Sequence, residues 1–154
     1  MATNGHTLYG SKQDWHVWKV LVTAKYAKAK VTLQEAFDKA EVTKHAGTDR
    51  LPVLKTAEGI YLSQSNSMVR YIARVKSEAN MYGTDAGQQS QIDGWIDFSL
   101  NELELPAAVW TYPLLGVEGY NPSDEAVAQA KVDVKAALDR LNSYLKDHTY
   151  LVGD

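Results

Sequence analysis

With 154 residues, of which 45% are hydrophobic and 23% charged, the chain can bury a substantial core and has the composition of an ordinary globular protein. A net charge of −3 without a basic stripe argues against nucleic acid as a direct partner, and the lack of cysteine excludes a disulfide framework and a thiolate zinc site. No segment approaches the roughly 18 apolar residues of a membrane span, so a cytoplasmic protein is expected.

Over the first half of the chain, short β-type runs alternate with helical ones. The residues Val31–Leu33, Val53–Lys55 and Ile60–Leu62 predict strands, and Thr56–Gly59 has the length and the glycine of a hairpin turn. A helix is expected from about Asn66 to Val75. Strands joined first by helices and then by a hairpin predict a mixed sheet covered by helices.

A possible ligand pocket is indicated where two of these strands begin and end. Pro52 cannot donate to a sheet ladder, so it suits the first position of a strand or a tight turn. The Leu51–Pro52 bond is a candidate cis peptide, since only X–Pro bonds make that isomer cheap, and such a turn would leave the backbone of Leu51 free to pair with an extended peptide. Gln64 and Ser65 open the next helix, whose first N–H groups suit a carboxylate.

Together these features predict a pocket for a small acidic peptide such as glutathione. Arg50, just before the turn, is a candidate to meet a ligand carboxylate, although an exposed arginine needs no such explanation. The alternative for the whole segment is a strand-starting Pro52 and a Ser65 that merely begins a helix, with no ligand.

The second half of the chain is expected to be helical after a linker from Ser77 to Gly87. Apolar residues recur at helical spacing from Ile92 to Leu103, in a helix that should stop before Pro106. Asn121 as a cap and Pro122 in the first turn predict the start of another helix. Its apolar stripe should comprise Val127, Ala130, Val134, Ala137, Leu138, Leu141 and Leu145.

The histidines and tryptophans are expected to have structural roles. None of the four histidines shows the spacing of a metal site, so no metal is expected. Large aromatic side chains usually anchor a core. We therefore expect core positions rather than a cofactor cage for Trp15, Trp18, Trp95 and Trp110.

From His6 to its last residue the sequence resembles the glutathione transferase fold. The resemblance implies a first strand at His6–Tyr9, a first helix at Asp14–Tyr26 and a second strand at Lys30–Phe37. It implies an α/β thioredoxin-like domain with a mixed sheet over residues 1–80, followed by an all-α domain over residues 87–154 that is incomplete. In this family a pair such as Gln64-Ser65 holds the γ-glutamyl end of glutathione.

A glutathione transferase must stabilise a thiolate with a hydroxyl near the start of its first helix. Tyr9, Ser11 and Ser63 are the hydroxyls nearby. Ser11 is the catalytic candidate, because it lies in the loop just before the positive end of that helix. The alternative is that Ser11 is an ordinary polar loop residue.

The second half resembles one family within this superfamily, the gamma subunit of eukaryotic translation elongation factor 1. The resemblance is carried by Trp110-Thr111-Tyr112-Pro113-Leu114-Leu115-Gly116, by Ala130-Lys131 and by the run from Tyr144 to Gly153. It implies a scaffold domain that holds exchange-factor subunits in protein synthesis. Two alternatives stay open: an active glutathione transferase acting on small electrophiles, and a similar docking domain of an aminoacyl-tRNA synthetase complex.

The resemblance also bears on the end of the chain. Relatives continue beyond Asp154 with helices that cover apolar faces of the Ile92–Leu103 and Val127–Leu145 helices. Part of those faces is therefore expected to meet water, and large exposed apolar patches usually mark an interface. We expect the chain to be a fragment of a longer protein, or to bury this surface against a partner or in a homodimer.

Overall fold

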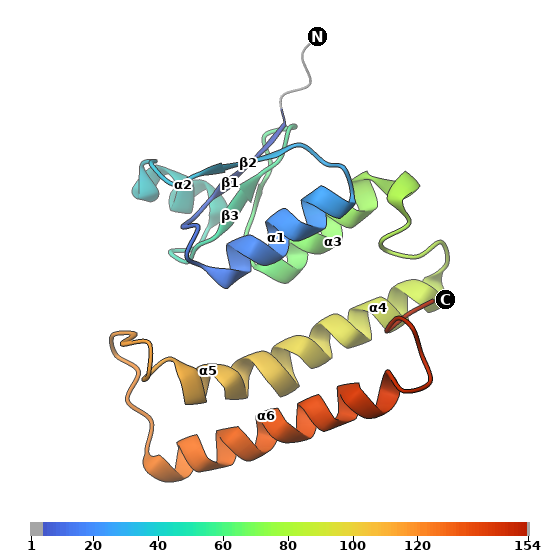
Figure 1. Cartoon of the computed structure of the whole chain (residues 1–154). Coiled ribbons are helices and arrows are strands. Elements are labelled where there is room, and N and C mark those ends of the chain that lie inside the picture. Colours follow the sequence, from blue (N-terminus) through green and yellow to red (C-terminus); the bar gives the residue numbers. More distant parts are fainter. Residues whose placement is uncertain (1–4, 154) are drawn as a thin grey trace. The chain divides into compact units, whose positions relative to one another are not determined.

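The computed structural model describes residues 5–153, and the chain divides into two compact units on either side of the Tyr82–Gly83 bond. The first unit contains strands β1 (His6–Tyr9), β2 (Val31–Gln34), β3 (Val53–Lys55) and β4 (Tyr61–Leu62), helices α1 (Trp15–Tyr26), α2 (Lys39–Ala46) and α3 (Ser65–Val75), and the 3₁₀ turn η1 (Ser77–Ala79) (Figure 1). The second contains α4 (Ala86–Phe98), the π-helical segment η2 (Ser99–Glu104), α5 (Leu105–Thr111) and α6 (Asp124–Tyr144).

The strands form one mixed sheet in the order β2-β1-β3-β4. β1 runs parallel to β2 and antiparallel to β3, and β4 is antiparallel to β3. In the hairpin, the Thr56 N–H donates to the Ile60 carbonyl at 2.8 Å, and Gly59 has a φ of 88°. The predicted thioredoxin-like α/β fold with a hairpin is confirmed.

The core of this unit lies between the sheet and the adjacent helices α1 and α3, which run side by side in Figure 1. Full burial of an aliphatic side chain is worth roughly 1.5–3 kcal/mol, so this layer positions both helices firmly against the strands. The side chains with no exposed surface include Leu8, Leu54, Val17, Val20, Met68 and Ile72.

The hairpin is tied to α3 by a polar contact. The Tyr71 hydroxyl donates to the Glu58 carboxylate at 2.9 Å. This hydrogen bond lowers the pKa of Glu58, while burial together with the same bond raises the pKa of Tyr71. The contact therefore stabilises the ionised carboxyl and the neutral phenol.

Strand β2 and the segment after it differ from expectation. The strand covers Val31–Gln34 rather than Lys30–Phe37. The chain leaves the sheet after Gln34, and Asp38 caps α2, its carboxylate accepting from the Glu41 N–H at 3.2 Å. Helix α2 was not among the elements that the sequence pattern predicted.

Pro106 does not end a helix, so that prediction is wrong. The helical backbone continues from α4 through η2 into α5, with Pro106 in the first turn of α5 (Figure 1). A proline lacks the N–H donor and clashes with the carbonyl of a regular preceding turn. The π-helical widening of η2 removes that conflict, and the first turn of α5 needs no donor from Pro106.

Helix α6 begins later than predicted. Its cap is Ser123, whose hydroxyl accepts from the Ala126 N–H at 3.2 Å, so the prediction of Asn121 as the cap is wrong. Within the expected stripe of α6, Ala130, Val134 and Ala137 are buried, whereas Leu138 and Leu145 are exposed.

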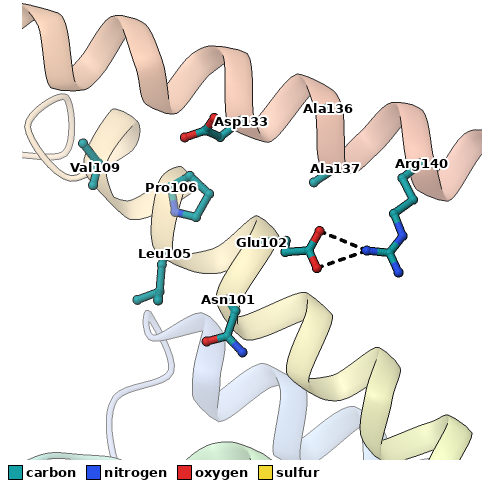
Figure 2. A pocket seen from close by; sticks show the side chains of 9 residues that line it. All are labelled: Asn101, Glu102, Leu105, Pro106, Val109, Asp133, Ala136, Ala137 and Arg140. Carbon is teal, nitrogen blue, oxygen red and sulfur yellow. Dashed lines mark hydrogen bonds and ion pairs between the residues drawn. The ribbon is translucent and has the colours of Figure 1, made fainter.

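A groove of about 650 Å³ lies in the helical unit, between α6 and the η2–α5 segment (Figure 2). Arg140 on α6 reaches across to Glu102, donating to both carboxylate oxygens at 3.0 Å. Apolar side chains make up much of the remaining lining, namely Leu105, Pro106, Val109, Ala136 and Ala137.

Two of the four tryptophans contradict the expectation of core positions. Trp15 and Trp18 are exposed, because Val17, Val20 and Ala24 occupy the core face of α1. In the helical unit, Trp95 is half-buried against the rings of Phe98 and Tyr144, and Trp110 is half-buried as well.

Of the helices within residues 5–153, none combines the length and apolar character needed to cross a membrane.

Candidate functional site

The predicted site residues lie on three segments that the sheet brings to one edge. β1 ends beside the start of β3, and β3 starts beside the end of β4, because both pairs are antiparallel. Ser11 follows β1, Leu51 and Pro52 precede β3, and Gln64 and Ser65 follow β4. Residues up to 54 positions apart in sequence therefore gather at the edge where α1 and α3 also begin.

The turn before β3 contacts the loop after β1. The Leu51–Pro52 peptide bond is cis, as predicted, and Pro52 is buried. A Cβ atom added at Gly10 would lie 3.3 Å from the Pro52 Cβ and 2.8 Å from the Val17 Cγ2. Gly10 is thus required for close packing between the loop, the cis turn and α1, a contact that sequence reasoning did not identify.

Gln64 joins β4 to α3 in an unusual backbone conformation. Its φ of 65° and ψ of 115° lie outside the regions that residues other than glycine favour. Such a conformation costs on the order of 1–3 kcal/mol and is concentrated at functional sites. The Gln64 side chain makes no capping hydrogen bond at the start of α3, and the first N–H groups of this helix are suited to a ligand anion.

Replacing Gln64 by glycine is expected to raise the free energy of unfolding by about 1 kcal/mol, because a residue without a Cβ atom adopts a positive φ with less strain and part of the gain is offset by its more flexible unfolded chain. Gln64→Ala is the matched control, since it removes the side chain and keeps the strain. Urea unfolding of both variants checks the prediction, which fails if glycine is no more stabilising than alanine.

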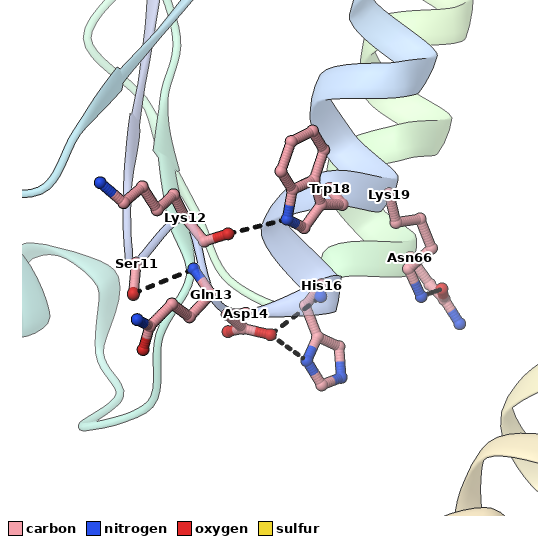
Figure 3. Close-up of polar contacts among 8 residues, drawn as sticks. All are labelled: Ser11, Lys12, Gln13, Asp14, His16, Trp18, Lys19 and Asn66. Atoms are coloured by element: carbon pink, nitrogen blue, oxygen red, sulfur yellow. Dashed lines mark hydrogen bonds and ion pairs between the residues drawn. The ribbon is translucent and has the colours of Figure 1, made fainter.

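The Ser11 loop is held in place by several hydrogen bonds (Figure 3). The Ser11 hydroxyl accepts from the Gln13 N–H at 3.2 Å, and the Ser11 carbonyl accepts from the Asp14 N–H at 3.0 Å. The Trp18 indole donates to the Lys12 carbonyl at 2.7 Å. Ser11 itself is exposed, and a hydroxyl that accepts a hydrogen bond can at the same time donate its proton to a ligand.

The helix that follows this loop begins as predicted. Asp14 is the cap of α1, and one of its carboxylate oxygens accepts from the His16 N–H and lies 2.8 Å from the His16 Nδ1. Between the two helices, the Lys19 ammonium donates to the Asn66 side-chain carbonyl at 2.7 Å, and this hydrogen bond joins α1 to the first turn of α3 (Figure 3). Neither Lys19 nor Asn66 was among the predicted site residues.

The electrostatics of this edge favour an anion. The starts of α1 and α3 both lie there, and a helix N-terminus carries a partial positive charge. The Asp14 carboxylate already caps α1, so the start of α3 is the one that favours a ligand anion. Arg50 adds an exposed cation close in sequence to the cis turn, and the backbone N–H of Arg50 donates to the Thr48 hydroxyl at 3.2 Å. Within residues 5–153, no cluster of three or more His, Asp or Glu side chains could hold a metal ion.

Comparison with solved structures defines the class of protein. Glutathione transferase F2 from Populus trichocarpa matches with a TM-score of 0.82 at 21% identity, covering 97% of this chain and 74% of that chain. A theta class glutathione S-transferase from Xanthomonas axonopodis pv. citri with glutathione bound gives a TM-score of 0.82 at 20% identity, covering 97% and 75%. The chain therefore has the glutathione transferase fold.

Sequence comparison finds relatives that share one name. Elongation factor 1-gamma 1 from Oryza sativa subsp. japonica is 34% identical over 159 residues, covering 99% of this chain and 37% of that protein. No protein-family model matches the chain. Over nearly its whole length the chain is similar in sequence to part of the elongation factor 1-gamma proteins, and it spans about a third of the length of the curated relatives it matches.

Proposed function

We propose that this chain acts in the cytoplasm as a scaffold domain that docks the exchange-factor subunits of elongation factor 1 during protein synthesis. The observation that carries the proposal is the 34% identity with an elongation factor 1-gamma over 99% of the chain. The likeness to glutathione transferases rests on fold, at 21% identity for the poplar enzyme. Sequence thus favours the elongation-factor role over conjugation of electrophiles.

A second function, glutathione binding, is favoured by the geometry of the sheet edge. We propose that Leu51, with its backbone, and the start of α3 at Gln64 and Ser65 bind the peptide, with Pro52 shaping the turn and Arg50 near a carboxylate. The uncapped α3 start and the strained Gln64 support this proposal. If the bound thiol is activated at all, Ser11 is the residue that would donate to its thiolate.

Co-purification tests the scaffold function. The tagged chain should retain exchange-factor subunits from a cytosolic extract, identified by mass spectrometry, in near-stoichiometric amounts. Recovery of aminoacyl-tRNA synthetases in their place would support the synthetase-complex alternative and overturn the proposal.

A conjugation assay tests the enzyme alternative separately. With glutathione and a small aromatic electrophile, the scaffold proposal expects the wild type to show no more turnover than Ser11→Ala. Turnover in the wild type that is lost in Ser11→Ala would instead favour an active transferase.

A further inference from the structure

The two helix starts at the candidate site differ in charge. At the start of α3 the Gln64 side chain makes no capping hydrogen bond, and the first turn contains no acidic residue. At the start of α1 the Asp14 carboxylate is the cap and accepts from the His16 N–H at 2.8 Å (Figure 3). The start of α3 is therefore suited to a ligand anion, whereas an anion of the chain itself already occupies the start of α1.

The negative charge of this cap exceeds the positive charge that a helix start offers. Aligned peptide dipoles place about half an elementary charge at a helix N-terminus, and an ionised carboxylate brings one full negative charge. His16 lies against the same carboxylate, with its Nδ1 2.8 Å from the Asp14 oxygen. A neutral imidazole donates one N–H there and adds no charge. The start of α1 consequently repels a second anion.

Other charged side chains near this edge do not offset the Asp14 carboxylate. The Lys12 Nζ lies 4.0 Å from the Glu35 carboxylate, so these two charges balance each other. The Lys19 ammonium donates to a side chain in the first turn of α3 at 2.7 Å, and Arg50 is exposed next to the cis turn. Both of these cations favour an anion at α3 or at the turn, which leaves Asp14 to set the charge preference at the start of α1.

A peptide bound at the proposed glutathione site would run beside the start of α1. The peptide is proposed to pair with Leu51 and to place its γ-glutamyl carboxylate at Ser65. A Cβ atom added at Gly10 would lie 3.3 Å from the Pro52 Cβ and 2.8 Å from the Val17 Cγ2, so the first turn of α1 packs close to the cis turn. The cysteinyl residue, which follows the γ-glutamyl group, therefore meets this part of the chain.

We propose that Asp14 determines which form of glutathione the site takes, namely the peptide with a protonated or S-substituted thiol and not the thiolate. The inference deepens the proposed glutathione binding and rests on it. A thiolate would bring a second negative charge next to the Asp14 carboxylate, and a nearby like charge disfavours ionisation of a thiol. The site thus binds glutathione and its thioethers without activating them, in agreement with a scaffold role.

Calorimetric titration with glutathione and with S-methylglutathione tests this preference. The two peptides carry the same carboxylates and amino group, so the ratio of their Kd values reports on the thiol alone. Between about pH 7 and pH 9.5, where a thiol ionises and an imidazole is ordinarily neutral, glutathione should weaken about fivefold relative to S-methylglutathione. A ratio that stays constant or moves in favour of glutathione would overturn the proposal.

Variants assign the effect to Asp14. Asp14→Asn keeps a good helix cap and removes the charge, so the ratio should change less than about twofold with pH or move in favour of glutathione. Asp85→Asn is the matched control, because Asp85 caps α4 and accepts from the Gly87 N–H at 2.8 Å. It should behave like the wild type. Equal shifts in the two variants would refute the role of Asp14, because the overall charge would then account for the effect.

A thiol built into the chain tests the same charge effect without a ligand. The sequence contains no cysteine, so Ser11→Cys introduces a single thiol in the turn where the Ser11 carbonyl accepts from the Asp14 N–H at 3.0 Å. With Asp14 present, this thiol should react with iodoacetamide no faster at neutral pH than free cysteine does. Adding Asp14→Asn should raise the rate at least about threefold, because a larger fraction of the thiol is ionised.

The two measurements separate the possible failures. Binding of neither peptide at millimolar concentration would refute the proposed glutathione site and the ligand preference with it. Equal alkylation rates with and without the Asp14 carboxylate would refute the role of Asp14 alone, whether or not glutathione binds. Circular dichroism verifies that each variant is folded.

Discussion

Replacing Gly10 by alanine is expected to lower the free energy of unfolding by about 1–3 kcal/mol. The added Cβ would lie 2.8 Å from the Val17 Cγ2, and a β-branched side chain in a helix has little freedom to rotate away. It would also press on Pro52, at 3.3 Å. The strain thus falls on α1 and the cis turn together, and urea unfolding measures it.

Gly94→Ala provides the matched control for this substitution. Gly94 lies inside α4, and within the described part of the chain a Cβ added there meets no atom within 4 Å. Alanine favours a helix interior over glycine, so this variant should gain about 0.5–1 kcal/mol. If both variants shift stability in the same direction, the close packing inferred at Gly10 is wrong.

Replacing Ser65 by alanine is expected to weaken glutathione binding by about 1.5–3 kcal/mol, which corresponds to roughly a tenfold to 150-fold rise in Kd. Ser65 is 8% exposed and is the first residue of α3, so its hydroxyl and the helix start are placed to share one carboxylate. Losing a hydrogen bond to a charged group accounts for the size of the effect. Titration calorimetry with glutathione measures it.

Ser67→Ala is the control for Ser65, because Ser67 lies in the same first turn of α3 but is exposed. It should leave the affinity for glutathione unchanged. Equal losses in the two variants would show that the Ser65 hydroxyl is not a specific contact. A wild type that binds no glutathione at millimolar concentration would mean that the site is residual, leaving the scaffold function as the remaining proposal.

Local signals predicted much of the first unit, because each depended on a few neighbouring residues. Thr56–Gly59 was identified as a hairpin turn, Val53–Lys55 as a strand and Pro52 as the residue after a cis bond, and the structure confirms all three. Caps, hairpin glycines and X–Pro bonds act through backbone groups close by in the sequence. Such local preferences depend little on the tertiary structure of the rest of the chain.

Local signals failed where two nearby residues could each cap a helix, and where the turn before a proline was irregular. Asn121 and Ser123 are both good caps two residues apart, and Ser123 starts α6. Pro106 is a helix breaker only after a regular turn, and the π-helical η2 supplies an irregular one. The choice between two neighbouring caps, and the irregular turn before a proline, cannot be read from a short segment of sequence.

The candidate site shows most clearly which features the sequence determined and which the tertiary structure decided. The sequence by itself determined which residues have the right chemistry, namely Leu51, Gln64 and Ser65, because a proline turn and a helix start can be recognised locally. Only the tertiary structure decided that these residues, Ser11 and Gly10 share one edge, since that requires the antiparallel pairing of β1, β3 and β4. It also decided which apolar face of α1 is buried, because two faces of similar hydrophobicity compete and the sheet can cover one.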